Sequence, residues 1–460
     1  MSLEHNNQIT RELLMTIPLR LPTLAIALAA SLAFSANAVA QGKDAAAILQ
    51  EIKSLKESYE RRTAELERKI KALETKQRVE AAKPSAPASY KRIVKDNSFN
   101  PSIGLVLNGK SSSFSRKAAG DMAGFAIGEE GERGSEGLSI DETELNFSTN
   151  VDDKFYGSMT AAIVREDGSD IIELEEAYVQ TLPSAGLADG ARIKFGRAFW
   201  TFGYLNEQHA HADDFADRPL PYRAYLNKAF NDDGIELSYV LPTDQYFEVG
   251  GGAFRGDDFP SGNSVTGLGG ASIFARTGGD LGNNESWRIG AYAMYSDANA
   301  RATEEGAVTF NGNSYLYAAD IRYTYAPTGN AKSQELILQA ELFQRDENGT
   351  YNVGGGPVAL DDTSVGYYAQ AVYKFTPAVR AGIRFSQLDP VDTPAGLVGT
   401  DLDSNSHHPR TLSLMADWTN SEYGRIRAQI NQEDLNNAGA DKQFILQYIM
   451  SLGAHGAHPF

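Results

Sequence analysis

Hydrophobic and polar residues alternate along most of the chain after about residue 103. One segment places Leu145, Phe147, Thr149 and Val151 on one face and Asn146, Ser148 and Asn150 on the other. A period of two is that of a β-strand with one apolar and one polar face. The alternation alone does not distinguish a soluble sandwich, whose apolar faces point inward, from a membrane barrel, whose apolar face points to lipid.

The lengths of the alternating segments and of their connections favour the membrane barrel. Strands of soluble proteins average about 5–6 residues and membrane strands about 9–11, and several segments here are long: 315–325, 334–343, 365–375 and 443–452. Short connections such as 151–154 and 376–377 alternate with long ones such as 110–137, 198–232, 297–313 and 346–363. Short turns on one side and long loops on the other are typical of outer-membrane barrels.

The sequence therefore predicts an all-β fold, a 16-stranded antiparallel transmembrane β-barrel over residues 101–460 with a short N-terminal α-helical coiled coil. The expected strands are 103–109, 138–148, 154–164, 172–181, 190–197, 233–241, 246–254, 270–277, 286–296, 314–325, 334–345, 364–375, 378–388, 410–419, 424–432 and 442–452. An even number of strands returns the chain to the side on which it began.

The first 40 residues have the pattern of an export signal. Arg11 and Arg20 precede an apolar run, 21–34, and small residues ending at Ala40 form an Ala-x-Ala cleavage site. The run is shorter than the roughly 20 residues that span a bilayer, so we expect cleavage rather than anchoring. With the terminal aromatic Phe460, this pattern predicts location in a bacterial outer membrane.

Residues 44–80 are the one convincingly helical stretch. Apolar residues fall at heptad positions at Ala45, Ile48, Ile52, Leu55, Tyr59, Leu66 and Leu73, which predicts a periplasmic coiled coil. A single amphipathic helix is the alternative. A linker rich in proline, alanine and serine, 81–100, then leads to the barrel.

Charge excludes some classes of function. The chain has 42 Lys and Arg against 60 Asp and Glu, and residues 1–83 hold 13 and 10 of these, which leaves 29 against 50, or a net charge of −21, in the remainder. This balance argues against nucleic acid as a partner and predicts a modest preference for cations. The chain has no cysteine, and it contains no Gly-x-Ser-x-Gly, His-Glu-x-x-His or phosphate-loop motif, so we expect no enzyme activity.

The histidines of the expected mature chain occur in pairs. His209 and His211 lie close to Asp213, Asp214 and Asp217, while His407 and His408 form a second pair. Imidazole and carboxylate groups are ligands for zinc, and acidic loops also suit calcium. Solvated loop histidines without a metal are the alternative, and no other cofactor is expected.

The arrangement of signal peptide, coiled coil, polar linker and sixteen strands resembles the phosphate-selective porin O and P family. That resemblance implies a homotrimeric channel whose third extracellular loop, here 198–232, folds inward and narrows the pore. The residues expected at the constriction are Arg197, Trp200, Tyr204, Asp213, Asp214, Asp217, Arg218, Arg223 and Lys228.

The segment 197–223 and the C-terminal residues 447–458 are also similar to outer-membrane proteins labelled zinc-regulated or TonB-dependent receptor. A TonB-dependent transporter has 22 strands and a folded plug, and residues 41–103 leave no room for that plug. Passive conduction is therefore the expected mechanism.

The function predicted from the sequence is that of an outer-membrane porin for small hydrophilic solutes or ions. The alternatives are a zinc-linked or other metal-linked outer-membrane uptake or binding protein, and a structural protein that tethers the envelope. Expected partners are outer-membrane lipid, lipopolysaccharide, other copies of the chain and the barrel-assembly machinery.

Overall fold

The computed structural model describes residues 101–453 except 117–120, 167–168, 263–266, 303–307, 401 and 422, together with Lys53, Lys56 and Arg68. The chain divides into two compact units, 1–95 and 96–460, of which the second is described here. The predicted signal peptide 1–40, the linker 81–100 and Phe460 lie outside the described residues, as does the predicted coiled coil 44–80 apart from those three positions.

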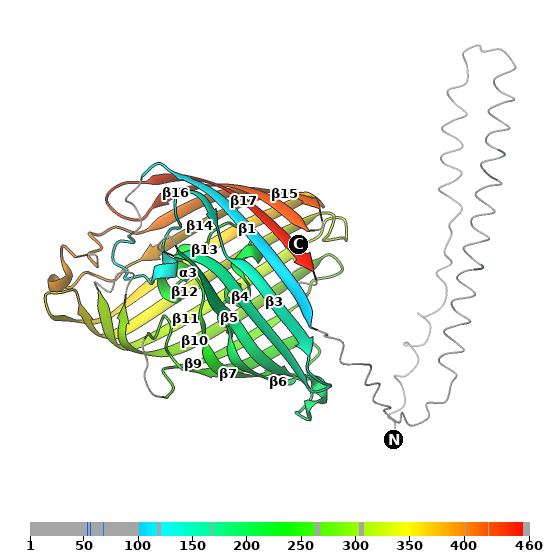
Figure 1. The fold of residues 1–460 in the computed structure, drawn as a ribbon, viewed down its shortest axis with the longest axis horizontal. Coiled ribbons are helices and arrows are strands. Elements are labelled where there is room, and N and C mark those ends of the chain that lie inside the picture. The colour runs from blue at the N-terminus through cyan, green and yellow to red at the C-terminus, as the bar shows by residue number, and fades with distance from the viewer. Residues whose placement is uncertain are drawn as a thin grey trace, which may run out of the picture. The chain divides into compact units, whose positions relative to one another are not determined.

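All the long described elements are strands (Figure 1). Their bounds are β1 Ser102–Phe114, β2 Gly137–Ile140, β3 Thr143–Asn150, β4 Phe155–Glu166, β5 Ser169–Thr181, β6 Ala191–Phe199, β7 Asn231–Val240, β8 Tyr246–Phe254, β9 Gly270–Asp280, β10 Glu285–Ala302, β11 Thr309–Tyr325, β12 Glu335–Asn352, β13 Pro357–Thr376, β14 Val379–Asp389, β15 Arg410–Ser421, β16 Gly424–Asp434 and β17 Asp441–Gly453. The described helices are short: η1 Glu129–Gly131, η2 Pro183–Ala185, η3 Leu205–Glu207, η4 Ala210–Ala212, α3 Leu220–Leu226 and η5 Ala395–Leu397.

The sheet closes on itself because β1 pairs with β17 as well as with β2 and β3. β2 and β3 follow one another along the same edge of β1, since β2 pairs with residues 109–112 and β3 with residues 102–106. They therefore occupy one place in the barrel. The prediction of a closed, 16-stranded antiparallel barrel is confirmed.

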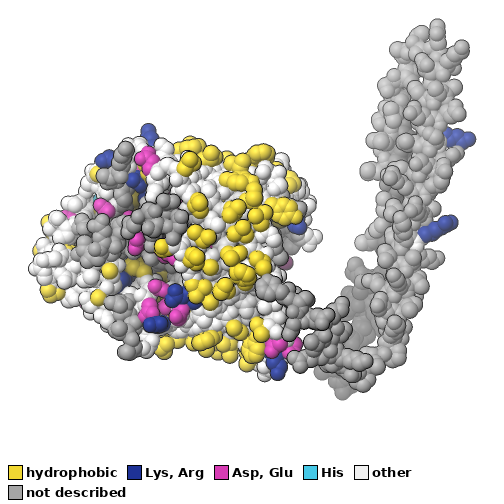
Figure 2. All heavy atoms as spheres, in the orientation of Figure 1, with side chains coloured by type: hydrophobic (Ala, Val, Ile, Leu, Met, Phe, Trp, Pro, Cys, Tyr) yellow, Lys and Arg dark blue, Asp and Glu magenta, His cyan; other side chains and the backbone are white. Residues whose placement is uncertain are grey.

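The barrel is apolar outside and polar inside, which is the reverse of a soluble protein. On β15, the outward side chains of Leu412, Leu414 and Trp418 are exposed, whereas Ser413 and Asp417 between them are buried. Figure 2 shows apolar side chains gathered over the outer face of the barrel. Exposed apolar strands in a closed sheet fit lipid, since every backbone group is paired within the sheet. This is the architecture of an outer-membrane barrel.

The four strands β10 to β13 are much longer than predicted, at 17–20 residues each. The predicted loops 297–313 and 346–363 are largely strand: β10 continues to Ala302 and β12 to Asn352. On β12 the outward residues change from Leu338 and Leu342 to Gln344, Asp346 and Asn348. Strand pairing thus continues beyond the apolar part of the outer face. The alternation of apolar and polar residues that predicts a membrane strand therefore ends before the strand itself ends.

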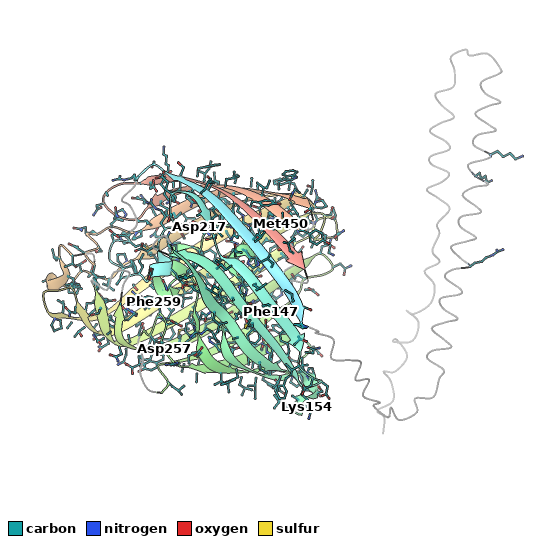
Figure 3. All side chains as sticks on the ribbon, in the orientation of Figure 1. Phe147, Lys154, Asp217, Asp257, Phe259 and Met450 are labelled. Atoms are coloured by element: carbon teal, nitrogen blue, oxygen red, sulfur yellow. The ribbon has the colours of Figure 1, made fainter. Side chains whose placement is uncertain are left out.

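The connections at the two ends of the barrel differ in length. Lys154 marks the short turn between β3 and β4, and Asp257 and Phe259 lie in the longer β8–β9 connection (Figure 3). The longest described connection, 200–230, joins β6 to β7 and carries η3, η4 and α3. In the described part of the chain, no helix is long and apolar enough to cross a membrane.

Candidate functional site

The connection 200–230, called here the inner segment, is held by an aromatic cluster. Trp200 and Phe202 are fully buried; Trp200 packs on Phe254 of β8, and Phe202 packs on Tyr292 of β10 and on Phe343 of β12. The Trp200 indole Nε1 also donates to the carbonyl oxygen of Asp232 at 2.8 Å. The aromatic half of the segment is thus packed against the barrel wall, and Trp200 does not face an open channel.

Glu341 of β12 organises the first turn of the inner segment. Its Oε2 accepts hydrogen bonds from the Tyr222 hydroxyl and from the backbone N–H of Tyr204, each at 2.9 Å. Tyr222 in turn accepts a bond from the N–H of Leu205. Gly203 has φ +71°, and a Cβ there would lie 2.4 Å from the Tyr222 hydroxyl and 2.6 Å from Glu341 Oε2. The close approach of three groups therefore requires glycine.

The three expected constriction carboxylates of the inner segment all pair with arginine. Asp214 lies 2.8 Å from Arg380 and Asp217 lies 2.6 Å from Arg384, both on β14, while Asp213 pairs with Arg218 within the segment at 2.6 Å. Two of the three carboxylates therefore join the inner segment to β14, and the third is held within the segment.

Burial and neighbouring charges shift the pKa of two of these carboxylates in opposite directions. Burial raises the pKa of Asp213 to about 7 despite the adjacent Arg218. Burial also acts to raise the pKa of Asp217, but Arg384 and a hydrogen bond from Gln429 outweigh it and lower this pKa. Of these two carboxylates, Asp217 is therefore the one that stays ionised and holds the inner segment to β14.

The remaining expected bases also have carboxylate partners. Arg223 lies 2.7 Å from Glu433 of β16 and donates through Nε to the carbonyl of Gly131. Lys228 pairs with Glu142 between β2 and β3, and Arg197 of β6 lies 2.8 Å from Asp233 of β7. With Asp214 and Asp217 bound to β14, the Arg223 and Lys228 pairs connect the inner segment to β16 and to the β2–β3 connection, whereas the Arg197 pair joins β6 to β7.

Tyr204 and Glu207 contact a cluster of three strand arginines that was not predicted. The guanidinium carbons of Arg288 and Arg322 lie 4.8 and 4.6 Å from the centre of the Tyr204 ring, and Arg276 pairs with Glu207 at 2.6 Å. Each arginine comes from a different strand, β9, β10 or β11. A scan along the chain does not find such a cluster, because strand neighbours are far apart in sequence.

The two histidine pairs have different surroundings. His211 Nδ1 lies 2.7 Å and His209 Nδ1 3.2 Å from Glu144 of β3. His407 instead contacts the carbonyl oxygen of Asp434 at 3.1 Å, and His408 contacts Asp389 at 2.8 Å. The structure does not bring the two pairs together.

Strand carboxylates replace the aspartates expected beside the first histidine pair. His209 is surrounded by Glu144, Glu175 and Glu176. Burial acts to lower the pKa of His209, but Glu144 and hydrogen bonds to all three carboxylates raise it well above its usual value. The three aspartates are instead occupied by arginines, because the segment turns them toward β14 and Arg218.

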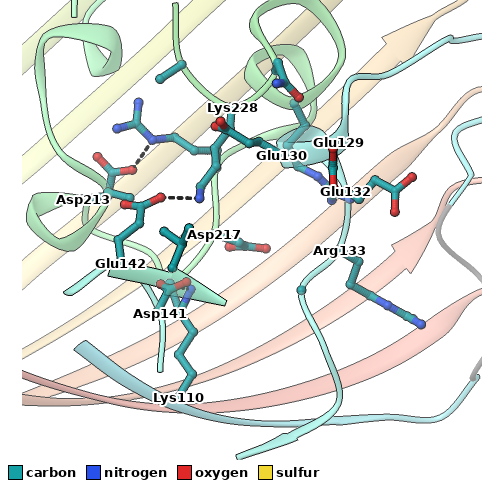
Figure 4. Close-up of a pocket in the computed structure, with 18 of the residues that line it drawn as sticks. Lys110, Glu129, Glu130, Glu132, Arg133, Asp141, Glu142, Asp213, Asp217 and Lys228 are labelled. Carbon is teal, nitrogen blue, oxygen red and sulfur yellow. Dashed lines mark hydrogen bonds and ion pairs between the residues drawn. The ribbon is translucent and has the colours of Figure 1, made fainter. Parts of the chain in front are cut away.

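A cavity of about 1220 Å³ lies beside the inner segment (Figure 4). Its wall includes residues of β1, β2 and β5, η1, and the segment itself. Its acidic lining residues are Glu129, Glu130, Glu132, Asp141, Glu142, Glu173, Glu175, Asp213, Asp217, Asp258 and Glu433, and its basic ones are Lys110, Arg133, Arg197, Arg218, Arg223 and Lys228.

Each of the six lining bases is in an ion pair. Besides the four described above, Lys110 lies 2.6 Å from Asp141 and Arg133 lies 2.7 Å from Asp441. The positive charge of each lining base is therefore offset by a paired carboxylate, and carboxylates outnumber bases on the cavity wall. Nine of these eleven acids lie outside the inner segment, among them Glu129 and Glu130 of η1, whereas the sequence pattern indicated Asp213 and Asp217 within the segment.

Comparison with known proteins gives one sequence relative and a set of similar barrels. No protein-family model matches the chain. The chain is 28% identical over 352 residues, 70% of each chain, to a protein of Aquifex aeolicus (strain VF5) described only as an uncharacterized protein.

Solved structures similar to the chain include outer-membrane channels and porins. The outer-membrane channel DcaP of Acinetobacter baumannii is 14% identical with a TM-score of 0.48, over 77% of this chain and 97% of that one. The anion-selective porin of Comamonas acidovorans is 10% identical with a TM-score of 0.48, over 77% and 99%. OmpF of Salmonella typhi, solved as a complex with daunomycin, is 12% identical with a TM-score of 0.48, over 76% and 97%.

Proposed function

We propose that the protein is a passive outer-membrane channel for small hydrophilic solutes that favours cations, with the inner segment folded inside the barrel as its constriction. The observation that carries the proposal is the wall of the 1220 Å³ cavity, where eleven carboxylates face six bases and every base is already paired. A polar interior enclosed by an apolar outer wall is what aqueous conduction needs.

The excess of carboxylates sets the sign of the expected selectivity. Fixed charges of one sign in a low-dielectric enclosure concentrate counter-ions of the other sign. An anion that enters the cavity meets bases already engaged by carboxylates, whereas a cation meets the acidic group Glu129, Glu130 and Glu132 near η1. The phosphate selectivity of the family that the sequence resembles is therefore not part of the proposal.

Reversal potentials in planar bilayers with a KCl gradient test the proposal. The wild-type channel should prefer K⁺ to Cl⁻, and the triple variant E129Q/E130Q/E132Q should shift the permeability ratio toward one. The matched control is D153N/D189N/D244N, which removes three charges from exposed residues in the short turns and should leave the ratio unchanged. A preference for Cl⁻ in the wild type, or an equal response of both triple variants, would contradict the acidic cavity as the selectivity filter.

We also propose that the channel is a homotrimer that associates through the outer face of β3 to β6. Apart from the four-residue β2, the shortest described strands are β3, β6, β7 and β8, at 8–10 residues. The outer face of β3 to β6 carries a shallow apolar groove of about 370 Å³ that includes Met159, Val179 and Phe195. Phe195→Arg should yield monomers in size-exclusion chromatography with light scattering, whereas Trp418→Arg, on the outer face of β15, should stay trimeric.

A further inference from the structure

Two imidazoles and one carboxylate converge in the wall of the barrel. Glu144 of β3, His209 and His211 offer donor atoms that all lie within 4.8 Å of one another. Their side chains are almost completely buried, with exposed fractions of 0%, 7% and 1% for the three residues. The two imidazole rings are stacked, with centroids 5.7 Å apart. The inner segment thus meets the wall through a compact set of nitrogen and oxygen donors.

A β-bulge on β5 adds two more carboxylates to this set. Thr160 of β4 pairs with Glu176, and the next residue, Ala161, pairs with Leu174, so Glu175 is the extra residue of the bulge. An extra residue shifts the alternation by one position, and both Glu175 and Glu176 therefore turn toward His209. Glu176 Oε2 lies 3.0 Å from Nε2 of the imidazole, and Glu175 Oε2 lies 3.4 Å from its Nδ1.

The contacts around His209 leave two buried oxygens poorly satisfied. Glu144 Oε2 and Glu175 Oε2 both approach the same nitrogen, His209 Nδ1, at 3.2 and 3.4 Å. Both oxygens are buried, and beyond this shared contact with His209 neither accepts a hydrogen bond within the described part of the chain. Since one imidazole nitrogen carries at most one proton, it cannot serve both oxygens. A cation placed among these groups would satisfy both oxygens.

The donor spacing suits a small transition-metal ion. Zinc bonds to histidine nitrogen and carboxylate oxygen at about 2.0–2.2 Å, so tetrahedral ligand atoms lie roughly 3.3 Å apart. Glu144 approaches His211 Nδ1 through Oε1 at 2.7 Å and His209 Nδ1 through Oε2 at 3.2 Å, so metal binding requires these groups to move apart by a few tenths of an ångström. Two imidazole ligands favour zinc and other late first-row transition-metal ions over calcium, which prefers oxygen ligands.

We infer that Glu144, His209 and His211 bind a divalent transition-metal ion of the Zn²⁺ type, with Glu175 and Glu176 as the adjacent carboxylates. The bound ion ties the middle of the inner segment to β3 and holds it against β5. The binding itself does not depend on the proposed channel function. The effect of metal binding on conductance does rest on the proposed function, because a tethered segment fixes the width of the constriction.

Zinc titration of the purified, full-length, EDTA-stripped protein in detergent tests the inference. The reference protein carries H407A/H408A/H455A/H458A, which removes the other histidines of the expected mature chain. Isothermal calorimetry should give one Zn²⁺ per chain with a dissociation constant in the micromolar range or below. Adding H211A or E144Q should weaken binding at least tenfold, and zinc-edge X-ray absorption of the reference protein should show two imidazole ligands.

Several results would overturn the metal site. These are the absence of Zn²⁺ binding by a reference protein that retains its heat-modifiable migration, equal binding by the reference and the H211A variant, and tighter binding of Ca²⁺ than of Zn²⁺. The first result would mean that the five groups form only an ion-pair network around a protonated His209. Because H211A could disturb folding, E144Q, which keeps the size of the side chain, serves as the second variant.

Conductance separates this inference from the proposed function. Micromolar Zn²⁺ should narrow the spread of single-channel conductances in the reference protein and should have no effect on H211A. If Zn²⁺ binds by calorimetry but no channel conducts, the proposed function fails and the metal site stands. If channels conduct and Zn²⁺ does not bind, the reverse holds.

Discussion

Asp417 and Arg427 face each other across neighbouring strands inside the barrel, with the carboxylate Oδ1 2.8 Å from the guanidinium Nε and both side chains buried. Arg380 of β14 reaches the same carboxylate through Nε at 2.9 Å. Arg380 also holds Asp214 of the inner segment. One buried carboxylate therefore joins three strands, β14, β15 and β16, and supports the anchor of the segment.

Replacing Asp417 by Asn should lower the free energy of unfolding by about 3–5 kcal/mol, because it leaves two buried guanidinium groups without their shared charge. Urea unfolding in detergent micelles, followed by tryptophan fluorescence, measures the change. The same substitution at the exposed turn residue Asp153 should change the free energy by less than about 0.5 kcal/mol. Equal effects at both positions would rule out the ion-pair network as a source of stability.

Deleting residues 205–225 should raise single-channel conductance severalfold, because the deletion removes most of the inner segment while leaving the paired strands β6 and β7 complete. Heat-modifiable migration in electrophoresis verifies that the deletion variant still forms a barrel. A folded variant with the conductance of the wild type would place the constriction elsewhere.

Replacing Asp217 by Asn should destabilise the protein in a pH-dependent way. Asp217 is contacted by Arg384, Gln429 and Asn431, and its pKa in the folded protein is lowered below the value of about 3.9 expected in the unfolded chain. A lowered pKa stabilises the fold above the unfolded pKa, and this stabilisation is lost as the pH falls through the folded pKa.

The difference in unfolding free energy between wild type and D217N should therefore be about 1–3 kcal/mol at pH 6 and should shrink below pH 4. Urea unfolding at pH 6, 4 and 3 measures it. A difference that stays constant down to pH 3 would show that Asp217 does not act through its charge.

Replacing Leu414 by Arg should impair insertion, because Leu414 faces outward from β15 and is 50% exposed on the apolar face. A lysine or arginine on the lipid face of a barrel costs about 2–4 kcal/mol at the bilayer midplane and little near the interfaces. Leu281, 54% exposed in the short turn between β9 and β10, provides the matched control. Leu281→Arg should fold into liposomes with the yield of the wild type; a similar loss of yield in both variants would contradict the assigned lipid face.

The sequence by itself determined the wall of the barrel. The alternation of side chains has the period of the strand, and a β-barrel repeats one local pattern around its circumference, so the sixteen strands and their short turns were predictable, although not all of their ends. The prediction stopped short where the local signal ends. On β12, the outward-facing residues Gln344 and Asp346 are polar, as residues of a loop would be. Only the pairing of β12 with β11 and β13 shows that the strand continues through them.

Only the tertiary structure decided what lies inside. From the sequence, the inner segment could be identified as an amphipathic connection rich in charge, and its histidines as candidate metal ligands. The strand residues that its charged groups and histidines contact could not be identified. Glu144 is 65 residues from His209, and Arg380 is 166 residues from Asp214. No local pattern links such residues, since the closure of the sheet brings them together. The bulge at Glu175 is also a property of strand pairing, and it determines which carboxylates reach His209.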